Sequence, residues 1–265
     1  MIPAEYFTMS MGGALVALIW PVLCVLAWRK YELNVVPAFF GTTAFLLTVL
    51  VLEPMLLNAA VRSNIATGAA YVLIAAIAAG VLEELPKWLS YRILRQNFQG
   101  VGVGISLGLG FGGGASVALC LQLIGQLQDF NTVNSGTLTL AETEAFIANL
   151  LRTEPVYFLL GSVDRLPEIF LQTALAMIVW YAVAHDRPIW LAAAVLLHIA
   201  AELPAAVMRV RGVDNLLLAE IVVFGTALAL LALAWRLCRR DLGVAGKRPL
   251  PAWEPGILTA GKGDE

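Results

Sequence analysis

Long apolar runs separated by short polar stretches dominate the chain. Seven of these runs reach the length of roughly 20 residues that a helix needs to cross the hydrocarbon core of a bilayer. The pattern therefore predicts an all-α fold, a polytopic transmembrane helical bundle of about seven spans. The runs lie near residues 11–28, 35–58, 67–89, 101–124, 156–184, 189–207 and 215–237.

Composition supports this prediction, because 60% of the residues are hydrophobic and only 14% are charged, whereas soluble domains are roughly a quarter charged. The lipid bilayer is therefore an expected partner. The net charge of -2 excludes a basic surface for nucleic acid. We expect residues 1–238 to form a single transmembrane helical domain, and residues 239–265, after the last apolar run, to form a flexible cytoplasmic tail.

Lysine and arginine residues are divided unequally between alternate loops. If the N-terminus lies outside, Arg29, Lys30 and Lys87 face the cytoplasm together with the basic residues after the last span. Arg62 and Arg152 then face outward. Cytoplasmic loops carry the excess of basic residues, so the sequence predicts a multi-pass protein of the cell membrane with its N-terminus outside and its C-terminus in the cytoplasm.

The fourth and fifth runs carry local signals of their own. Gly104, Gly108 and Gly112 recur every four residues, which predicts a seam where helices approach closely. The polar stretch 125–154 is expected to be a loop, whose second half has the apolar spacing of a short amphipathic helix at the outer surface. Pro167 predicts a kink or a break in the fifth run.

Ionisable residues stand out at the end of the third run, in Glu83-Glu84-Leu85-Pro86-Lys87. Such residues within a span are costly, and they indicate a functional site unless another reason for them is found. Glu84 and Glu83 precede Lys87 by three and four residues, so either pair can meet on one helical face. The alternative is a juxtamembrane charge cluster that anchors the helix among the lipid headgroups.

Other polar residues fall at nearby depths in other runs. A rise of 1.5 Å per residue places Glu83 and Glu84 roughly 9 Å from the cytoplasmic end, His198 about 15 Å and Gln172 about 19 Å. Two carboxylates and a histidine suffice to activate water, with the glutamate taking its proton and the histidine stabilising an oxyanion. The alternative for His198 is a structural hydrogen bond to Glu202, one turn further on.

A metal centre is a weaker interpretation of the same residues. One histidine with two or three glutamates, and no HExxH pattern, is a small ligand set for zinc. We therefore expect no metal and no other cofactor, with zinc or another divalent ion as the minor alternative.

Two segments of the first two runs, residues 27–31 and 37–41, together with Glu83-Glu84 and Lys87, resemble the YhfC-like intramembrane proteases. These belong to the broader CAAX prenyl protease-like and PrsW-like group of glutamic membrane proteases. In the sixth run the family motif His-x-x-x-Asp reads His198 to Glu202. The resemblance covers nearly the whole chain, and it implies peptide-bond hydrolysis in membrane-associated peptide or protein substrates by glutamate-activated water.

At three positions the chain lacks the histidine or acid of the family motifs. Phe111 and Gln172 stand where the family has histidines, and Ala115 stands where it has an acid. The fifth-run motif Glu-Arg reads Asp164-Arg165. The resemblance implies the following site: Glu83, Glu84 and His198 as catalytic residues, and Lys87, Gln172, Asp164, Arg165 and Glu202 as supporting residues.

Two other functions remain open on the sequence. The replacements at Phe111, Ala115 and Gln172 fit a catalytically degenerate relative that binds membrane peptides or partner proteins without cleaving them. A small-solute carrier would use the same carboxylates as a pathway, but the runs show no inverted repeat of the kind that supports such a transporter. The protease is the leading hypothesis.

Overall fold

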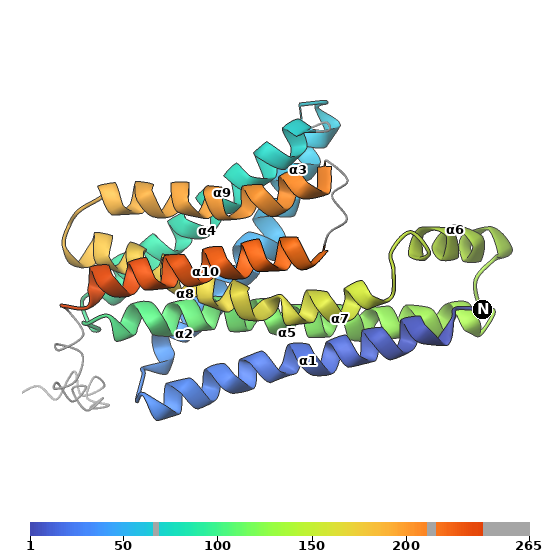
Figure 1. The fold of residues 1–265 in the computed structure, drawn as a ribbon, viewed down its shortest axis with the longest axis horizontal. Helices are drawn as coiled ribbons and strands as arrows, with labels where there is room; N and C mark the ends of the chain where they lie inside the picture. The colour runs from blue at the N-terminus through green and yellow to red at the C-terminus, as the bar shows by residue number, and fades with distance from the viewer. Residues whose placement is uncertain (66–68, 211–215, 241–265) are drawn as a thin grey trace, which may run out of the picture.

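The computed structural model describes residues 1–65, 69–210 and 216–240 of the 265-residue chain. Every regular element in this described part is a helix. Helices α1, α5, α8, α9 and α10 run roughly along the longest axis of the molecule, and α4 crosses it obliquely (Figure 1). The helices are α1 (Ala4–Lys30), α2 (Val35–Leu47), the π-helix η1 (Thr48–Leu52), α3 (Glu53–Arg62), α4 (Ala69–Leu94), α5 (Gly102–Asn134), α6 (Leu140–Leu150), α7 (Val156–Val163), α8 (Arg165–Ala184), α9 (Ile189–Val210) and α10 (Leu216–Cys238).

Five helical segments are long and apolar enough to cross a membrane, and they make this a multi-pass membrane protein. The prediction of an all-α transmembrane bundle is confirmed. The other two predicted spans are also helical, as α4 and α9, although α4 contains Glu83, Glu84 and Lys87. The total of seven spans and the N-terminus outside remain predictions. The five segments are Ala4–Lys30, Val35–Arg62, Gly102–Asn134, Val156–Ala184 and Ile221–Cys238.

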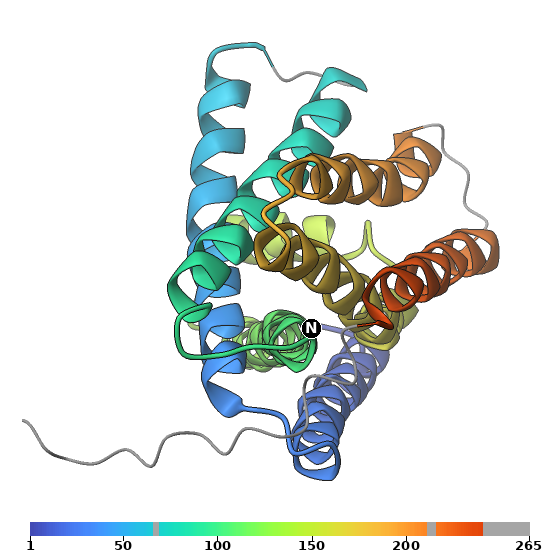
Figure 2. The same ribbon diagram turned by 90° about the vertical axis from the view of Figure 1, so that its left-hand side faces the viewer.

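Helix α8 lies at the centre of one half of the bundle, packed against α4, α5, α9 and α10 (Figure 2). Its side chains are buried almost continuously from Leu171 to Trp180. A helix that is apolar on all faces belongs in such a position, because no face of it has to meet a polar environment. Polar residues on α8 are therefore forced to find partners on neighbouring helices.

Glycines on α5 bring other backbones close to it, which confirms the predicted seam. A Cβ atom on Gly108 would overlap Thr173 Cα of α8, and one on Gly110 would overlap the backbone of Ala38 in α2. Close backbone approach of this kind replaces the hydrophobic driving force that helices in lipid lack. The seam fixes α5 between α2 and α8.

The predicted loop over residues 125–154 is wrong in its first half, because α5 continues as helix to Asn134. The amphipathic helix in the second half is confirmed as α6, which begins with a capping box between Thr139 and Glu142. Hydrogen bonds from the side chain and backbone of Thr139 lower the pKa of Glu142.

The predicted break in the fifth run is present at Asp164, where α7 ends and α8 begins three residues before Pro167. Helix α10 ends at Cys238, where the transmembrane domain was predicted to end. Residues 241–265, almost all of the predicted flexible tail, lie outside the described residues, so the division into 1–238 and 239–265 remains a prediction.

Candidate functional site

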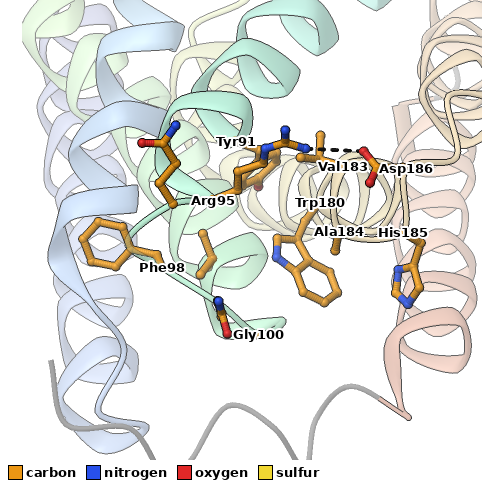
Figure 3. Close-up of a pocket in the computed structure, with 12 residues that line it drawn as sticks. Tyr91, Arg95, Phe98, Gly100, Trp180, Val183, Ala184, His185 and Asp186 are labelled. Carbon is orange, nitrogen blue, oxygen red and sulfur yellow. Dashed lines mark hydrogen bonds and ion pairs between the residues drawn. The ribbon is translucent and has the colours of Figure 1, made fainter.

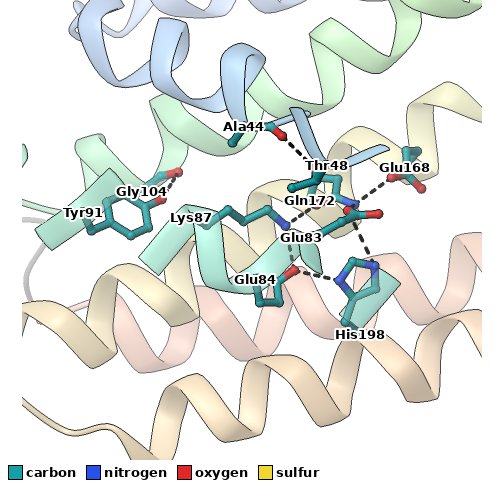
Figure 4. Close-up of polar contacts among 10 residues, drawn as sticks. All are labelled: Ala44, Thr48, Glu83, Glu84, Lys87, Tyr91, Gly104, Glu168, Gln172 and His198. Atoms are coloured by element: carbon teal, nitrogen blue, oxygen red, sulfur yellow. Dashed lines mark hydrogen bonds and ion pairs between the residues drawn. The ribbon is translucent and has the colours of Figure 1, made fainter. Parts of the chain in front are cut away.

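The acidic pair of α4 points into the bundle, toward α8 and α9 (Figure 4). Glu84 and Lys87 are fully buried and Glu83 is 7% exposed. Lys87 follows Glu84 by one helical turn, so both side chains leave α4 on the same face. The anchoring alternative required these charges to reach the headgroups, and their burial does not fit it.

Lys87 connects three helices. Its Nζ donates to Glu84 Oε1 at 2.6 Å and also donates to Gln172 Oε1 of α8. The same Nζ lies 4.4 Å from the centre of the Phe111 ring of α5. An ammonium group has three N–H donors and attracts the face of an aromatic ring. The charge of Lys87 is therefore enclosed by a carboxylate, an amide oxygen and a π-face.

Gln172 has one orientation that suits all its neighbours. Lys87 can only donate, so the amide oxygen of Gln172 must face it. The amide nitrogen then donates to Glu83 Oε2 at 2.8 Å and to Glu168 Oε1 at 2.8 Å. Gln172 thus places a donor between two carboxylates, which reduces their mutual repulsion and joins α4 to α8.

His198 of α9 completes the cluster. Its Nδ1 lies 2.7 Å from Glu84 Oε1 and its Nε2 lies 3.8 Å from Glu83 Oε2. Two buried atoms in this cluster, His198 Nε2 and Glu84 Oε2, have no hydrogen-bond partner. Buried polar atoms are nearly always paired. The free atoms therefore mark where a water molecule or a substrate group can be held.

Two further acids lie beside this cluster, and neither was among the predicted site residues. Glu168 contacts Gln172 one turn before it on α8. Glu53 stands at the first position of α3 and interacts electrostatically with His198, Glu168 and Glu202. Each is an acid inside an apolar run, and this position alone could have identified both as candidate site residues from the sequence.

The remaining predicted residues are distributed differently. Glu202 lies one turn after His198 on α9, within electrostatic range of Glu53. Asp164 joins α7 to α8, and Arg165 begins α8 about 10 Å along the helix from Gln172. Arg165 lines a groove formed with α1, α2 and α5, so its side chain points away from the cluster.

A separate pocket of about 580 Å³ opens at the end of the bundle where α4 and α8 finish (Figure 3). Arg95 and Asp186 form an ion pair of 3.3 Å across it. Tyr91, which is 1% exposed, forms part of its wall and follows Lys87 by one helical turn. The pocket therefore comes within one turn of the buried cluster.

The donor atoms of the cluster decide whether it can hold a metal ion. The described residues contain no group of three or more His, Cys, Asp or Glu side chains arranged to bind one. Glu84 Oε1 already accepts a hydrogen bond from Lys87 and lies against His198 Nδ1. A catalytic zinc ion needs three protein ligands, and here it would have to displace a lysine ammonium. This arrangement of donors does not fit a metal.

The chain is 25% identical over 242 residues to a Bacillus subtilis (strain 168) protein named "Uncharacterized membrane protein YhfC". The matched region covers 86% of this chain and 93% of that protein. No solved structure matches the chain. The profile of a family described as "YhfC intramembrane metalloprotease" matches residues 14–223, a range that includes the whole buried cluster. The chain therefore belongs to the YhfC intramembrane metalloprotease family.

Proposed function

We propose that the protein is an intramembrane endopeptidase that hydrolyses peptide bonds of membrane-associated peptides or proteins by glutamate-activated water. The observation that carries the proposal is the convergence of Glu84 and His198, each with one unpaired polar atom, in a buried cluster. The family description supports the reaction class. Water held between a carboxylate and an imidazole is the arrangement that general base catalysis requires.

In this proposal Glu84 is the base. Its Oε1 is held by Lys87 and His198, while its Oε2 is free to take a proton from water. The resulting hydroxide attacks the carbonyl carbon, and the negative charge moves to the carbonyl oxygen. When the C–N bond breaks, the proton on Glu84 passes to the leaving nitrogen, so the carboxylate is regenerated.

His198 supports the charged intermediate. As an imidazolium it donates from Nδ1 to Glu84 and has a second N–H on Nε2, which has no hydrogen-bond partner and lies 3.8 Å from Glu83 Oε2. A donor aimed at a developing oxyanion in a water-poor site contributes strongly to catalysis. Glu83 and Gln172 orient the cluster through their 2.8 Å hydrogen bond.

The family description includes a metal, and in this chain we assign the fixed positive charge to Lys87 instead. Its ammonium sits 2.6 Å from the proposed base. No step of the proposed reaction passes through a metal, because the donors found around Glu84 and His198 do not fit one. The supporting residues of the proposal are Lys87, Gln172, Glu83, Glu168, Glu53 and Glu202, whereas Asp164 and Arg165 are assigned no part in the chemistry.

The second candidate is a relative that binds membrane peptides without cleaving them. The Phe111 ring covers one side of Lys87, and Phe111 is itself 1% exposed. A substrate would have to reach a cluster that is closed on this side. This candidate predicts capture of a membrane peptide with no products.

Cleavage of a transmembrane-peptide library by the purified protein, read by mass spectrometry, separates the two candidates. Glu84→Gln should lower turnover by about two to four orders of magnitude, the contribution expected of a general base. Glu144→Gln, on the surface helix α6, is the matched control and should cleave as the wild type does. Equal turnover by Glu84→Gln and wild type would rule out the proposed base, and capture without products would favour the second candidate.

A further inference from the structure

A second cavity, of about 810 Å³, lies on the outside of the bundle and away from the carboxylates. Helices α1 and α2 both pack on α5 (Figure 2). Residues of all three helices line the cavity, which is a groove between α1 and α2 with α5 as its floor. Its floor is made of small residues, and its rims carry apolar side chains that are 40 to 63% exposed. The rim residues are Val25, Leu46, Leu50, Val117 and Leu121.

The groove is apolar along most of its length and polar at one end. Arg165 and Gln122 stand there. Arg165 opens the 20-residue helix α8, so it lies roughly 30 Å along the helix from the opposite end. This distance equals the hydrocarbon thickness of a bilayer. If the hydrocarbon core coincides with α8, the polar end of the groove is level with one membrane interface and α7 lies beyond it.

Arg165 has a charge that nothing in the described part of the chain neutralises. Its Nε donates to the backbone oxygen of Gly161 at 3.3 Å. No described carboxylate forms an ion pair with it, not even that of the adjacent Asp164. An arginine at the edge of lipid without a counter-ion is costly, and its planar fork of donors is suited to phosphate.

We propose that this groove binds one anionic phospholipid, with an acyl chain along α5 and the headgroup phosphate on Arg165. From Gln122 to Gly110 the floor of the groove is roughly 18 Å long, a little more than half the hydrocarbon thickness. The volume is within the range of small-molecule sites. One acyl chain with an anionic headgroup matches a groove that is apolar along its floor and carries the charge of Arg165 at one end.

Gly161 supplies a selective way to fill the groove. It lines the cavity, and a Cβ atom added to it would meet nothing within 4 Å. Gly161→Leu should therefore fold and fill the polar end of the groove, beside Arg165. Gly225→Leu is the matched control, because Gly225 has equally open surroundings on α10, outside the groove. Val117→Phe, from the exposed rim, fills the same groove from another side.

The test is native mass spectrometry of the full chain released from nanodiscs that contain phosphatidylglycerol and phosphatidylcholine with identical acyl chains. Wild-type protein should retain a single phosphatidylglycerol about tenfold more than phosphatidylcholine. Both lipids carry a phosphate, but the choline ammonium of phosphatidylcholine neutralises its phosphate and is repelled by Arg165. Arg165→Gln should remove this preference and leave chain binding. Gly161→Leu and Val117→Phe should lose the retained lipid, whereas Gly225→Leu should keep it.

Three outcomes would overturn the proposal. Equal retention of the two lipids by wild-type protein would leave Arg165 without its assigned ligand. Retention by folded Gly161→Leu and Val117→Phe proteins would identify annular lipid bound elsewhere. An equal loss of preference in Arg62→Gln, whose arginine lies outside the groove on α3, would show a general surface-charge effect.

Discussion

Lys87 is the residue on which the electrostatic balance of the cluster depends. It is fully buried and forms a 2.6 Å ion pair with Glu84. Removing one partner of a buried pair leaves an uncompensated charge and costs about 3 to 5 kcal/mol. We predict that Lys87→Met lowers the thermal unfolding midpoint of the detergent-solubilised protein strongly.

A double variant separates the lost ion pair from lost packing. Adding Glu84→Gln to Lys87→Met removes the stranded carboxylate, so part of the unfolding midpoint should return. Lys30→Met, at an exposed position, should leave the midpoint unchanged. No recovery in the double variant would mean that the two charges do not stabilise one another.

The same lysine leads to a prediction about metal. Because its ammonium holds the carboxylate oxygen nearest to His198, we expect purified protein to contain well below one equivalent of zinc or another divalent metal by elemental analysis. Chelators should change neither the unfolding midpoint nor any peptide turnover. A stoichiometric metal that protects against unfolding would contradict the role assigned to Lys87.

At the scale of helices, the glycine contacts of α5 make a matched pair of substitutions informative. Gly41 of α2 lies so close to α5 that a Cβ atom would overlap Leu107 O, whereas Gly225 of α10 has open space around it. Gly41→Ala should destabilise the protein by about 1 to 3 kcal/mol, as overpacking does. Gly225→Ala should be neutral or stabilising by about 0.5 to 1 kcal/mol.

Unfolding in denaturant, followed by tryptophan fluorescence, measures both variants. The opposite order of stability would show that α2 and α5 can separate without cost. Equal destabilisation by the two substitutions would instead show that alanine in place of glycine destabilises these helices regardless of their contacts.

Depth along each helix was predictable from the sequence, and rotation about each helix axis was not. Counting residues placed Glu84, His198 and Gln172 at nearby levels, and the structure brings Glu84 and Gln172 to Lys87 and His198 to Glu84. The count could not say which face of α8 meets α4, since that depends on packing between helices. Arg165 was predicted to support the cluster, but its side chain lies in a groove on another face of α8.

The hydrophobic pattern also predicted the end of one helix, α5, wrongly. Residues 126–134 are rich in polar side chains and were expected to form a loop, yet α5 continues through them. Helix α5 there packs against the start of α1, where Phe130 meets Tyr6 and Phe7. Contacts between distant segments stabilised a helix that the local hydrophobic pattern did not indicate.

At the scale of the whole molecule, the orientation in the membrane is the prediction with the broadest consequences. Fluorescent-protein fusions after Cys238 should fluoresce, and alkaline phosphatase fusions after Arg62 should be active, if the distribution of basic residues sets the orientation. Inactive phosphatase after Arg62 together with active phosphatase after Cys238 would show the opposite orientation in the membrane. The lipid groove would then open to the cytoplasmic leaflet.

The π-helix η1 makes the orientation of the following helix depend on the number of residues in the chain as well as on their types. A π-turn has hydrogen bonds one residue longer than those of an α-turn, so it acts as a single inserted residue and rotates the following helix by about 100°. Thr48–Leu52 stands directly before Glu53, which interacts with His198. Relatives that lack this extra residue would present a different side chain to that histidine. A one-residue insertion or deletion, and not only a substitution, is therefore a route by which this family can gain or lose an acid beside the site.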